Sequence, residues 1–265
     1  MRLSLNTATV KRATLAEAAR LCADNGITGI GPWRDAVDAA GGPKTARALL
    51  DSYGLTVTSL CRGGFFTSPG GEEDTRRAVE EAATLGTGEL VLVVGGLPAG
   101  TKNLPAARQT VADAIERLVP VAARHGVRLA IEPLHPMFCA DRAVMSTLSQ
   151  VLDLAERFAP HEVGVVVDTY HVWWDPELFS QLARARGRIS CYQVCDWILP
   201  LPEDMLLGRG HVGDGHIDFA PITQAVLDAG YHGFAEVEIF NQSIWDTPPS
   251  ETVSTITSRW QKTFP

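Results

Sequence analysis

Short apolar runs alternate with longer amphipathic segments eight times along the chain. The runs are rich in valine, isoleucine and leucine and are bounded by turn residues, which is typical of buried strands. The predicted strands are Leu3–Asn6, Ile27–Gly31, Leu55–Leu60, Glu89–Val94, Arg128–Glu132, Gly164–Asp168, Ile189–Val194 and Phe234–Glu238. Continuous apolar runs such as these suit strands that are covered on both faces, as in a parallel sheet.

The segments between these runs carry apolar residues at helical spacing. Thr14 and Glu17 form a capping-box signature at the start of the first helix, and Gly26 closes it. Gly42 precedes the second helix, and Gly54 ends it. The other predicted helices are residues 72–86, residues 104–126, Asp141–Phe158, Pro176–Ala185 and Pro221–Ala229.

Alternating strands and helices with short connections predict parallel strands with right-handed crossovers. Eight such units close most naturally into a (β/α)8 TIM barrel, here one domain over residues 1–265. An open, doubly wound sheet is the alternative, but the first βα turn carries no GxGxxG, which argues against a dinucleotide site. The longest irregular stretch, Ile198–Asp218, is expected to be a functional or mobile loop.

Four strands in the second half of the chain end with an oxygen-bearing side chain. These are Glu132, Asp168, Gln193 and Glu238. Because side chains alternate between the two faces of a strand, all four point to one face and apolar residues to the other. The apolar face must pack against helices, so the polar groups point into the barrel. Burying them there without a counter-charge would be costly, and a divalent cation is the simplest counter-charge. Alternatively, the acids pair with Arg128 or Arg209, or cap helices.

The motifs around these strand ends are IEPLH, VVVDTYH, YQVCDW, RGHVGDGHIDF and GFAEVEIF. This series resembles the xylose isomerase-like barrels of the sugar phosphate isomerase/epimerase family. The resemblance implies that one divalent metal ion binds to Glu132, Asp168, Gln193 and Glu238. Gln193 departs from the pattern, since the family usually has histidine there. An amide oxygen is a harder and weaker ligand than imidazole, so we expect Mn²⁺ or Mg²⁺ rather than zinc.

The same resemblance assigns roles to neighbouring residues. His171, in the DxxH pattern, and Arg209, beside a glycine-rich turn, are expected to contact substrate oxygens. His135 either contacts substrate or packs within its loop. Trp174 is one of several rim aromatics that suit a sugar face, although core packing explains these aromatics equally well.

Two further acids call for partners. Asp196 is expected to orient Gln193 or Arg209. Glu236 lies on the inward face one layer below Glu238, and Arg128 is its expected partner by depth.

The resemblance implies a metal-dependent isomerase or epimerase for a ketose or keto-sugar, in which Glu132 and Glu238 exchange a proton next to the carbonyl through an enediolate. The large subunits of C-glycoside deglycosidases also resemble this chain. They eliminate an aglycone from a 3-keto-glucoside, often with a small partner subunit, and His135 would be the base. A third possibility is a sugar-binding barrel that lost catalysis through Gln193.

The composition of the chain limits the kinds of partner that it is expected to bind. The 265 residues carry a net charge of −8 and no block of basic residues, which argues weakly against nucleic acid. The N-terminus lacks a signal-peptide core, no apolar run has membrane-spanning length, and five cysteines without CxxC suit reduced thiols, so we expect a cytoplasmic protein with no membrane partner. No lysine- or arginine-rich phosphate pocket stands out, which favours an unphosphorylated sugar. A homo-oligomer stays open.

Overall fold

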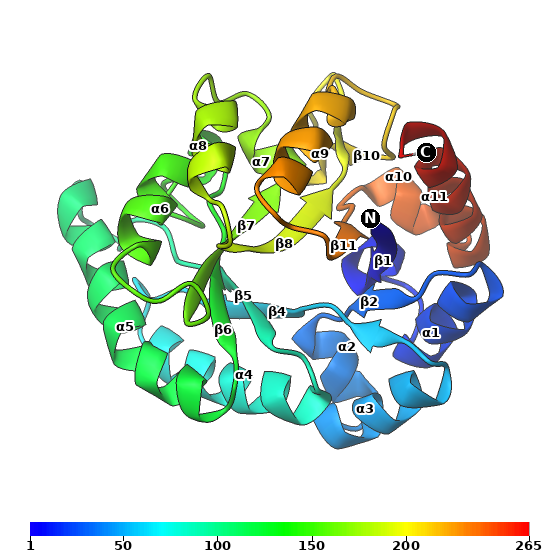
Figure 1. Cartoon of the computed structure of the whole chain (residues 1–265), viewed down its shortest axis with the longest axis horizontal. Coiled ribbons are helices and arrows are strands. Elements are labelled where there is room, and N and C mark those ends of the chain that lie inside the picture. The colour runs from blue at the N-terminus through cyan, green and yellow to red at the C-terminus, as the bar shows by residue number, and fades with distance from the viewer. Residues whose placement is uncertain (265) are drawn as a thin grey trace.

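Nine strands form one parallel sheet that curls into a barrel, with helices around the outside (Figure 1). The computed structural model describes residues 1–264. The strand order is β3-β2-β1-β11-β8-β7-β6-β5-β4, and a parallel bridge between Trp33 and Cys61 joins the two ends of the sheet. The predicted single-domain TIM barrel is therefore confirmed.

The strands lie close to their predicted positions. They are β1 Arg2–Asn6, β2 Gly29–Gly31, β3 Thr56–Val57, β4 Leu60–Gly64, β5 Glu89–Val93, β6 Arg128–Ile131, β7 Val163–Asp168, β8 Ile189–Val194 and β11 Phe234–Val237. The third predicted strand, Leu55–Leu60, was wrong in its extent. It is split into β3 and β4, and it continues to Gly64 because a bulge at Arg62 lets it follow β5 to the rim.

The helices follow the strands in turn. They are α1 Leu15–Asp24, α2 Arg34–Ala39, α3 Pro43–Ser52, α4 Gly71–Leu85, α5 Leu104–Arg124, α6 Leu148–Ala155, α7 Thr169–Val172, α8 Leu178–Arg184, α9 Phe219–Asp228, α10 Gln242–Asp246 and α11 Pro249–Thr263, with 3-10 turns η1 Thr7–Val10, η2 Pro136–Phe138 and η3 Met205–Leu207. The capping box of Thr14 and Glu17 is present at the start of α1. Within residues 1–264, every helix is too short or too polar to cross a bilayer.

The predicted helix Asp141–Phe158 is only partly helical. Helix α6 begins after Thr147, whose hydroxyl accepts from the Gln150 N–H, so the helix starts at this N-cap. The preceding residues form a turn, and Ala143 makes a parallel bridge with Gly95, just beyond the end of β5. This pairing carries Arg142 to the rim of the barrel.

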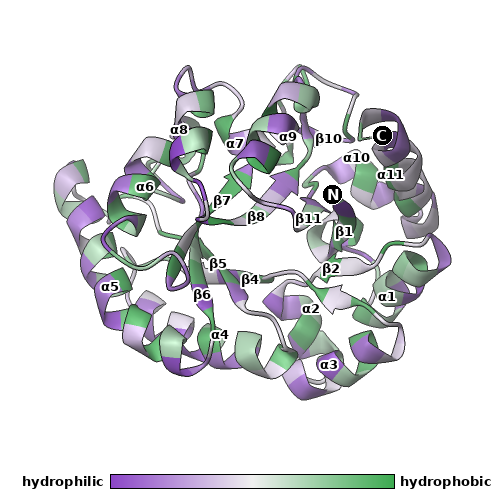
Figure 2. Cartoon of the chain, viewed as in Figure 1, coloured by the Kyte–Doolittle hydropathy of each residue, from purple (hydrophilic) through white to green (hydrophobic). Residues whose placement is uncertain are grey.

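The predicted alternation of faces is confirmed. Val165, Val167, Tyr192 and their neighbours pack in the large core between sheet and helices. A smaller apolar cluster fills the barrel interior and consists of Cys61, Val91, Ala130, Val166 and Cys191. Figure 2 shows hydrophobic colour along the strands and alternating colours along the outer helices. The acids lie directly above the small interior cluster, and their side chains are buried.

The stretch Ile198–Asp218 contains a short strand and the 3-10 turn η3. Two short strands, β9 Asp196–Trp197 and β10 Arg209–Gly210, pair antiparallel and close residues 198–208 into a loop. The Tyr170 hydroxyl donates to the Met205 carbonyl and holds the loop between them. The pairing places Arg209 opposite Trp197, over the mouth of the barrel.

Candidate metal and substrate site

Three carboxylates meet at the carboxyl end of the barrel. Glu132 directly follows β6, Asp168 ends β7, and Glu238 directly follows β11. All three are buried. Asp168 also caps α7, since its Oδ1 accepts from the Tyr170 N–H at 2.8 Å. Capping and a place in the cluster, which the sequence offered as alternatives, are therefore both true of Asp168.

Arg209 is fully buried among these acids. Its Nη1 donates to Asp168 Oδ2 at 2.8 Å and to Glu238 Oε2 at 3.2 Å. The guanidinium also lies 4.8 Å from the Tyr170 ring centroid and 5.1 Å from that of Phe240. The sequence left open that Arg209 pairs with the strand-end acids. This pairing is present for Asp168 and Glu238, whereas Glu132 receives no hydrogen bond from Arg209.

One guanidinium does not neutralise three buried carboxylates. Burial raises the pKa of Glu132 well above its usual range, and the nearby Asp168 and Glu238 raise it further. Burial also raises the pKa of Asp168, although Arg209 opposes the shift. For Glu238, burial raises the pKa to about 7, against the effect of Arg209. The cluster therefore lacks positive charge.

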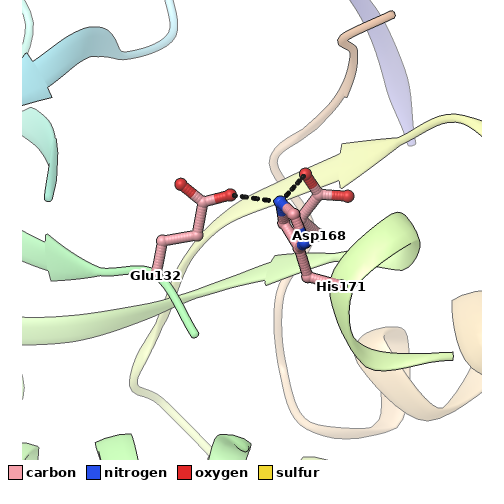
Figure 3. Close-up of side chains that lie close together, drawn as sticks. All are labelled: Glu132, Asp168 and His171. Atoms are coloured by element: carbon pink, nitrogen blue, oxygen red, sulfur yellow. Dashed lines mark ion pairs between the residues drawn. The ribbon is translucent and has the colours of Figure 1, made fainter. Parts of the chain in front are cut away.

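His171 faces the same cluster from α7. Its Nε2 lies 3.8 Å from Glu132 Oε1 and 3.8 Å from Asp168 Oδ2 (Figure 3). One ligand atom from each of these three residues lies within 4.8 Å of the others, so the group could hold a metal ion. Burial lowers the pKa of His171 well below its usual value, and Arg209 lowers it further, which keeps the ring neutral.

Gln193 lies on β8 in register with Asp168 on β7 and with Glu236 on β11. Its Nε2 donates to Glu236 Oε1 at 3.1 Å. Because a carboxylate only accepts, this bond fixes which way the amide faces. The opposite atom, Oε1, is buried and has no hydrogen-bond partner among the described residues. A buried acceptor beside Asp168 is therefore left free.

Glu236 has no arginine partner, so the predicted pairing with Arg128 was wrong. Neutral donors satisfy its carboxylate. They are Asn6 Nδ2, Thr58 Oγ1, Ser59 Oγ and Gln193 Nε2, at 2.5–3.2 Å. Arg128 instead donates to Glu89, at 3.0 Å from Nε, near the amino end of the barrel. Gly31 makes room for Glu236, since a Cβ there would lie 2.3 Å from Glu236 Oε2.

Asp196 orients neither Gln193 nor Arg209, contrary to prediction. Its carboxylate accepts backbone N–H groups of Gly213, Gly215 and Ile217 at 2.8–3.0 Å. These bonds close the glycine-rich turn that follows Arg209. Asp196 therefore shapes the loop that carries the arginine.

His135 and Trp174 lie beside the cluster. The two rings meet edge to face, with centroids 5.2 Å apart, and Trp197 lies equally close to His135. His135 Nδ1 accepts from the Met137 N–H at 3.2 Å, so the neutral ring carries its hydrogen on Nε2. Burial lowers the pKa of His135. The neutral ring therefore presents an N–H donor at Nε2.

The pocket over the acids includes residues that the sequence analysis did not assign to the site. Trp33 Nε1 donates to Glu238 Oε1 at 3.1 Å. Arg62 and Arg142 line the same pocket. No sequence signal marks the two arginines, because they are 80 positions apart and neither lies in a basic run. A larger cavity of about 490 Å³ lies between α1 and α2, but it contains none of the three acids.

Comparisons with known proteins identify the family of the chain. The family profile described as xylose isomerase-like TIM barrel matches residues 19–263, so the chain belongs to that family. A crystal structure of protein SMc04130 from Sinorhizobium meliloti is 48% identical, with a TM-score of 0.94 and coverage of 98% of both chains. The crystal structure of a 3-keto-D-glucoside 4-epimerase from E. coli shares the fold at 19% identity, with a TM-score of 0.73 and coverage of 94% of each chain.

Curated relatives are enzymes. A 3-dehydroshikimate dehydratase of Pseudomonas aeruginosa is 27% identical over 249 residues, which are 89% of this chain and 37% of the relative. An inosose isomerase of Bacillus velezensis is 25% identical over 156 residues, 56% of this chain and 52% of the relative. The chain thus spans about half, or less, of the curated relatives that it matches.

Proposed function

We propose that this protein is a divalent-metal-dependent isomerase or epimerase of a ketose or keto-sugar. The observation that carries the proposal is the set of three buried carboxylates with only one buried guanidinium among them. Such a cluster has a strong electrostatic demand for a cation. The named activities of the relatives, an isomerase, an epimerase and a dehydratase, support the same class of chemistry.

The donor set fits a divalent cation. Glu132, Asp168 and Glu238 supply carboxylate oxygens, and the free Gln193 Oε1 supplies a fourth oxygen. His171 suits this role less well, because its Nε2, the ring nitrogen that faces the acids, lies 3.0 Å from Arg209 Nη2, and a guanidinium group can only donate to it. An all-oxygen set favours Mn²⁺ or Mg²⁺. In one structure of the same fold, the IOLI protein, the bound metal is zinc.

When bound, such a cation would polarise the substrate carbonyl and stabilise the enediolate. Proton transfer is then the task of the chain's own side chains. Glu132 receives no hydrogen bond from Arg209, and its raised pKa suits a group that takes and returns a proton. Glu238, with a pKa raised to about 7, is the second acid–base group. Arg209 and His171 would bind the substrate oxygens.

Proton exchange in D2O tests this proposal. The protein is incubated with Mn²⁺ and a panel of ketoses and keto-sugars, and deuterium next to the carbonyl is followed by NMR. Incorporation that stops on chelation and in Glu132→Gln supports the proposal. A protein that binds no Mn²⁺ and exchanges no proton would instead be a non-catalytic sugar-binding barrel.

A second candidate is elimination from a 3-keto-glycoside. The observation that favours it is His135, whose Nε2–H lies in an aromatic surround next to the acids. A departing aglycone needs a proton, which Glu238, with its pKa raised to about 7, can supply, while the neutral His135 ring donates a hydrogen bond. Release of aglycone from a 3-keto C-glycoside, with and without a small partner subunit, separates the two reactions. His135→Gln would abolish release but spare exchange.

A further inference from the structure

Two arginines, Arg62 and Arg142, line the pocket over the acids. Glu132, Asp168 and Glu238 come from β6, β7 and β11, whereas Arg62 lies in β4 and Arg142 immediately precedes Ala143, which is bridged to Gly95 just beyond β5. Since β4 and β5 are neighbours in the sheet, the two arginines share one side of the mouth. A ligand in this pocket would therefore meet both carboxylates and these two guanidinium groups.

A β-bulge places Arg62 on this side of the mouth. Cys61 pairs with Val91 and Gly63 with Leu92, which leaves Arg62 as the extra residue of the ladder. A bulge re-aims the side chain of the extra residue, and such bulges are common next to active sites. The guanidinium carbon lies 4.1 Å from the Phe65 ring centroid, so an aromatic face supports it. Arg62 is thus held at the pocket wall.

Neither arginine has a good anionic partner. Among residues 1–264, no carboxylate oxygen lies within 4.0 Å of the Arg62 guanidinium, and the nearby Asp74 is bound by Arg34 at 2.7 Å. Arg142 Nε lies 3.5 Å from Asp141 Oδ2 but makes no hydrogen bond, and this nitrogen is buried.

The two arginines also repel each other. Burial lowers the pKa of Arg62, and the charge of Arg142 lowers it further. Two half-buried guanidinium groups of the same pocket, without carboxylate hydrogen bonds, leave a demand for an anion.

We propose that Arg62 and Arg142 bind an oxyanion of the substrate, a carboxylate or a phosphate monoester, so that the substrate is an acidic rather than a neutral keto-sugar. The planar guanidinium group matches both anions through paired N–H donors. The proposal rests on the proposed function only in placing the reacting carbon at the acids of the same pocket. A phosphate monoester would contradict the expectation of an unphosphorylated sugar, whereas a carboxylate would not.

Three six-carbon polyols with different ends test the proposal: D-glucitol, D-gluconate and D-glucitol 6-phosphate. Their dissociation constants are measured by titration calorimetry at one fixed salt concentration, with Mn²⁺ and again with a chelator. We expect at least one anion to bind about tenfold or more tightly than glucitol, as for one charge-assisted hydrogen-bond pair. Tighter binding of D-gluconate would indicate a carboxylate site, and tighter binding of D-glucitol 6-phosphate would indicate a phosphate site.

Variants locate the bound anion. Arg62→Gln and Arg142→Gln should each reduce the preference for the anion to within about threefold and leave glucitol binding unchanged, while Arg62→Lys should retain part of it. Arg20→Gln is the matched control, since Arg20 is exposed and pairs only with Asp24 on the same helix. Circular dichroism checks that each variant is folded. If Arg62→Gln does not fold, the test uses Arg142→Gln.

Two results would overturn the proposal. One is a wild-type protein that binds neither anion tenfold more tightly than glucitol. The other is a preference for the anion that remains in both glutamine variants. A preference that the wild-type protein loses on addition of chelator would also overturn the proposal, because the anion would then bind to the metal ion and not to the arginines. Calorimetry needs no turnover, so it tests anion binding independently of the proposed function. The protein can prefer the anion without exchanging a proton in D2O, or exchange a proton without preferring the anion, and the two experiments tell these cases apart.

Discussion

Two layers of acidic side chains lie one above the other inside the barrel, and they differ in the hydrogen-bond donors that their carboxylates receive. The lower layer is Glu236, which accepts hydrogen bonds from Asn6, Thr58, Ser59 and Gln193. The upper layer is the group of Glu132, Asp168 and Glu238, in which Asp168 and Glu238 share the guanidinium of Arg209 and Glu132 receives no hydrogen bond from it. Both layers are buried. Only the lower acid has neutral donors on both carboxylate oxygens.

The difference separates structural acids from functional ones. A buried carboxylate with several donors stabilises the fold, because its desolvation is offset by hydrogen bonds. Carboxylates held close together with too little positive charge destabilise the folded state, and such groups are concentrated at functional sites. Gln193 connects the layers: its amide N–H bonds the lower acid and its free oxygen belongs to the upper layer.

The largest expected effect comes from replacing an upper acid. Glu132→Gln should reduce proton exchange by about 10²–10⁴-fold, the usual contribution of a general base. Its unfolding free energy without added metal should stay level or rise, because the substitution relieves carboxylate repulsion.

Glu236→Gln is the matched control in the lower layer. It should lose about 1–3 kcal/mol in urea unfolding, since an amide N–H would face other donors. If both substitutions change stability in the same direction, the contrast between the layers is wrong.

Arg209→Met comes next. It leaves Asp168 and Glu238 buried without their shared cation and should cost about 3–5 kcal/mol of unfolding free energy in a chelator. Added Mn²⁺ should restore part of the loss. Arg128→Met, which breaks the half-buried pair with Glu89 at the other end of the barrel, should cost less and show no rescue. Equal rescue of both variants would mean that the metal binds elsewhere.

The pH dependence of stability should show the upper layer directly. Glu238 has a usual pKa of 4.5 and one of about 7 in the folded protein, so its protonated form stabilises the fold at low pH. Glu238 therefore contributes about 3 kcal/mol to the free energy of unfolding below pH 4.5, and this contribution is lost as the pH rises through about 7. Urea unfolding at several pH values in a chelator measures it. Glu238→Gln should reduce this slope by the contribution of Glu238, while Glu132 and Asp168, whose pKa values are also raised, keep the rest. An unchanged slope would assign all of it to those other groups.

The smallest effect is expected at the residue between the layers. Gln193→His replaces an amide oxygen with an imidazole nitrogen and should raise the affinity for Zn²⁺ relative to Mn²⁺ by about tenfold. Competition between the two metals, followed by calorimetry, checks this ratio. A ratio that does not change would place Gln193 outside the metal site.

The sequence alone determined the barrel and the direction in which its acids point. Eight apolar runs alternating with amphipathic segments allow few arrangements other than a closed parallel sheet. Within each run, the period of two places Glu132, Asp168 and Glu238 on the inward face whatever their partners are. These features are local, so they can be read from neighbouring residues.

Only the tertiary structure decided which groups meet. The partners of Glu236 come from β1, from the region of β3 and from β8, and no local pattern links them to it. Arg62 reaches the pocket through a bulge, and Arg142 through a bridge to β5, over 80 positions of chain. Such contacts depend on the closure and register of the whole sheet. The charge balance of the pocket, and therefore its ligand, depends on that closure.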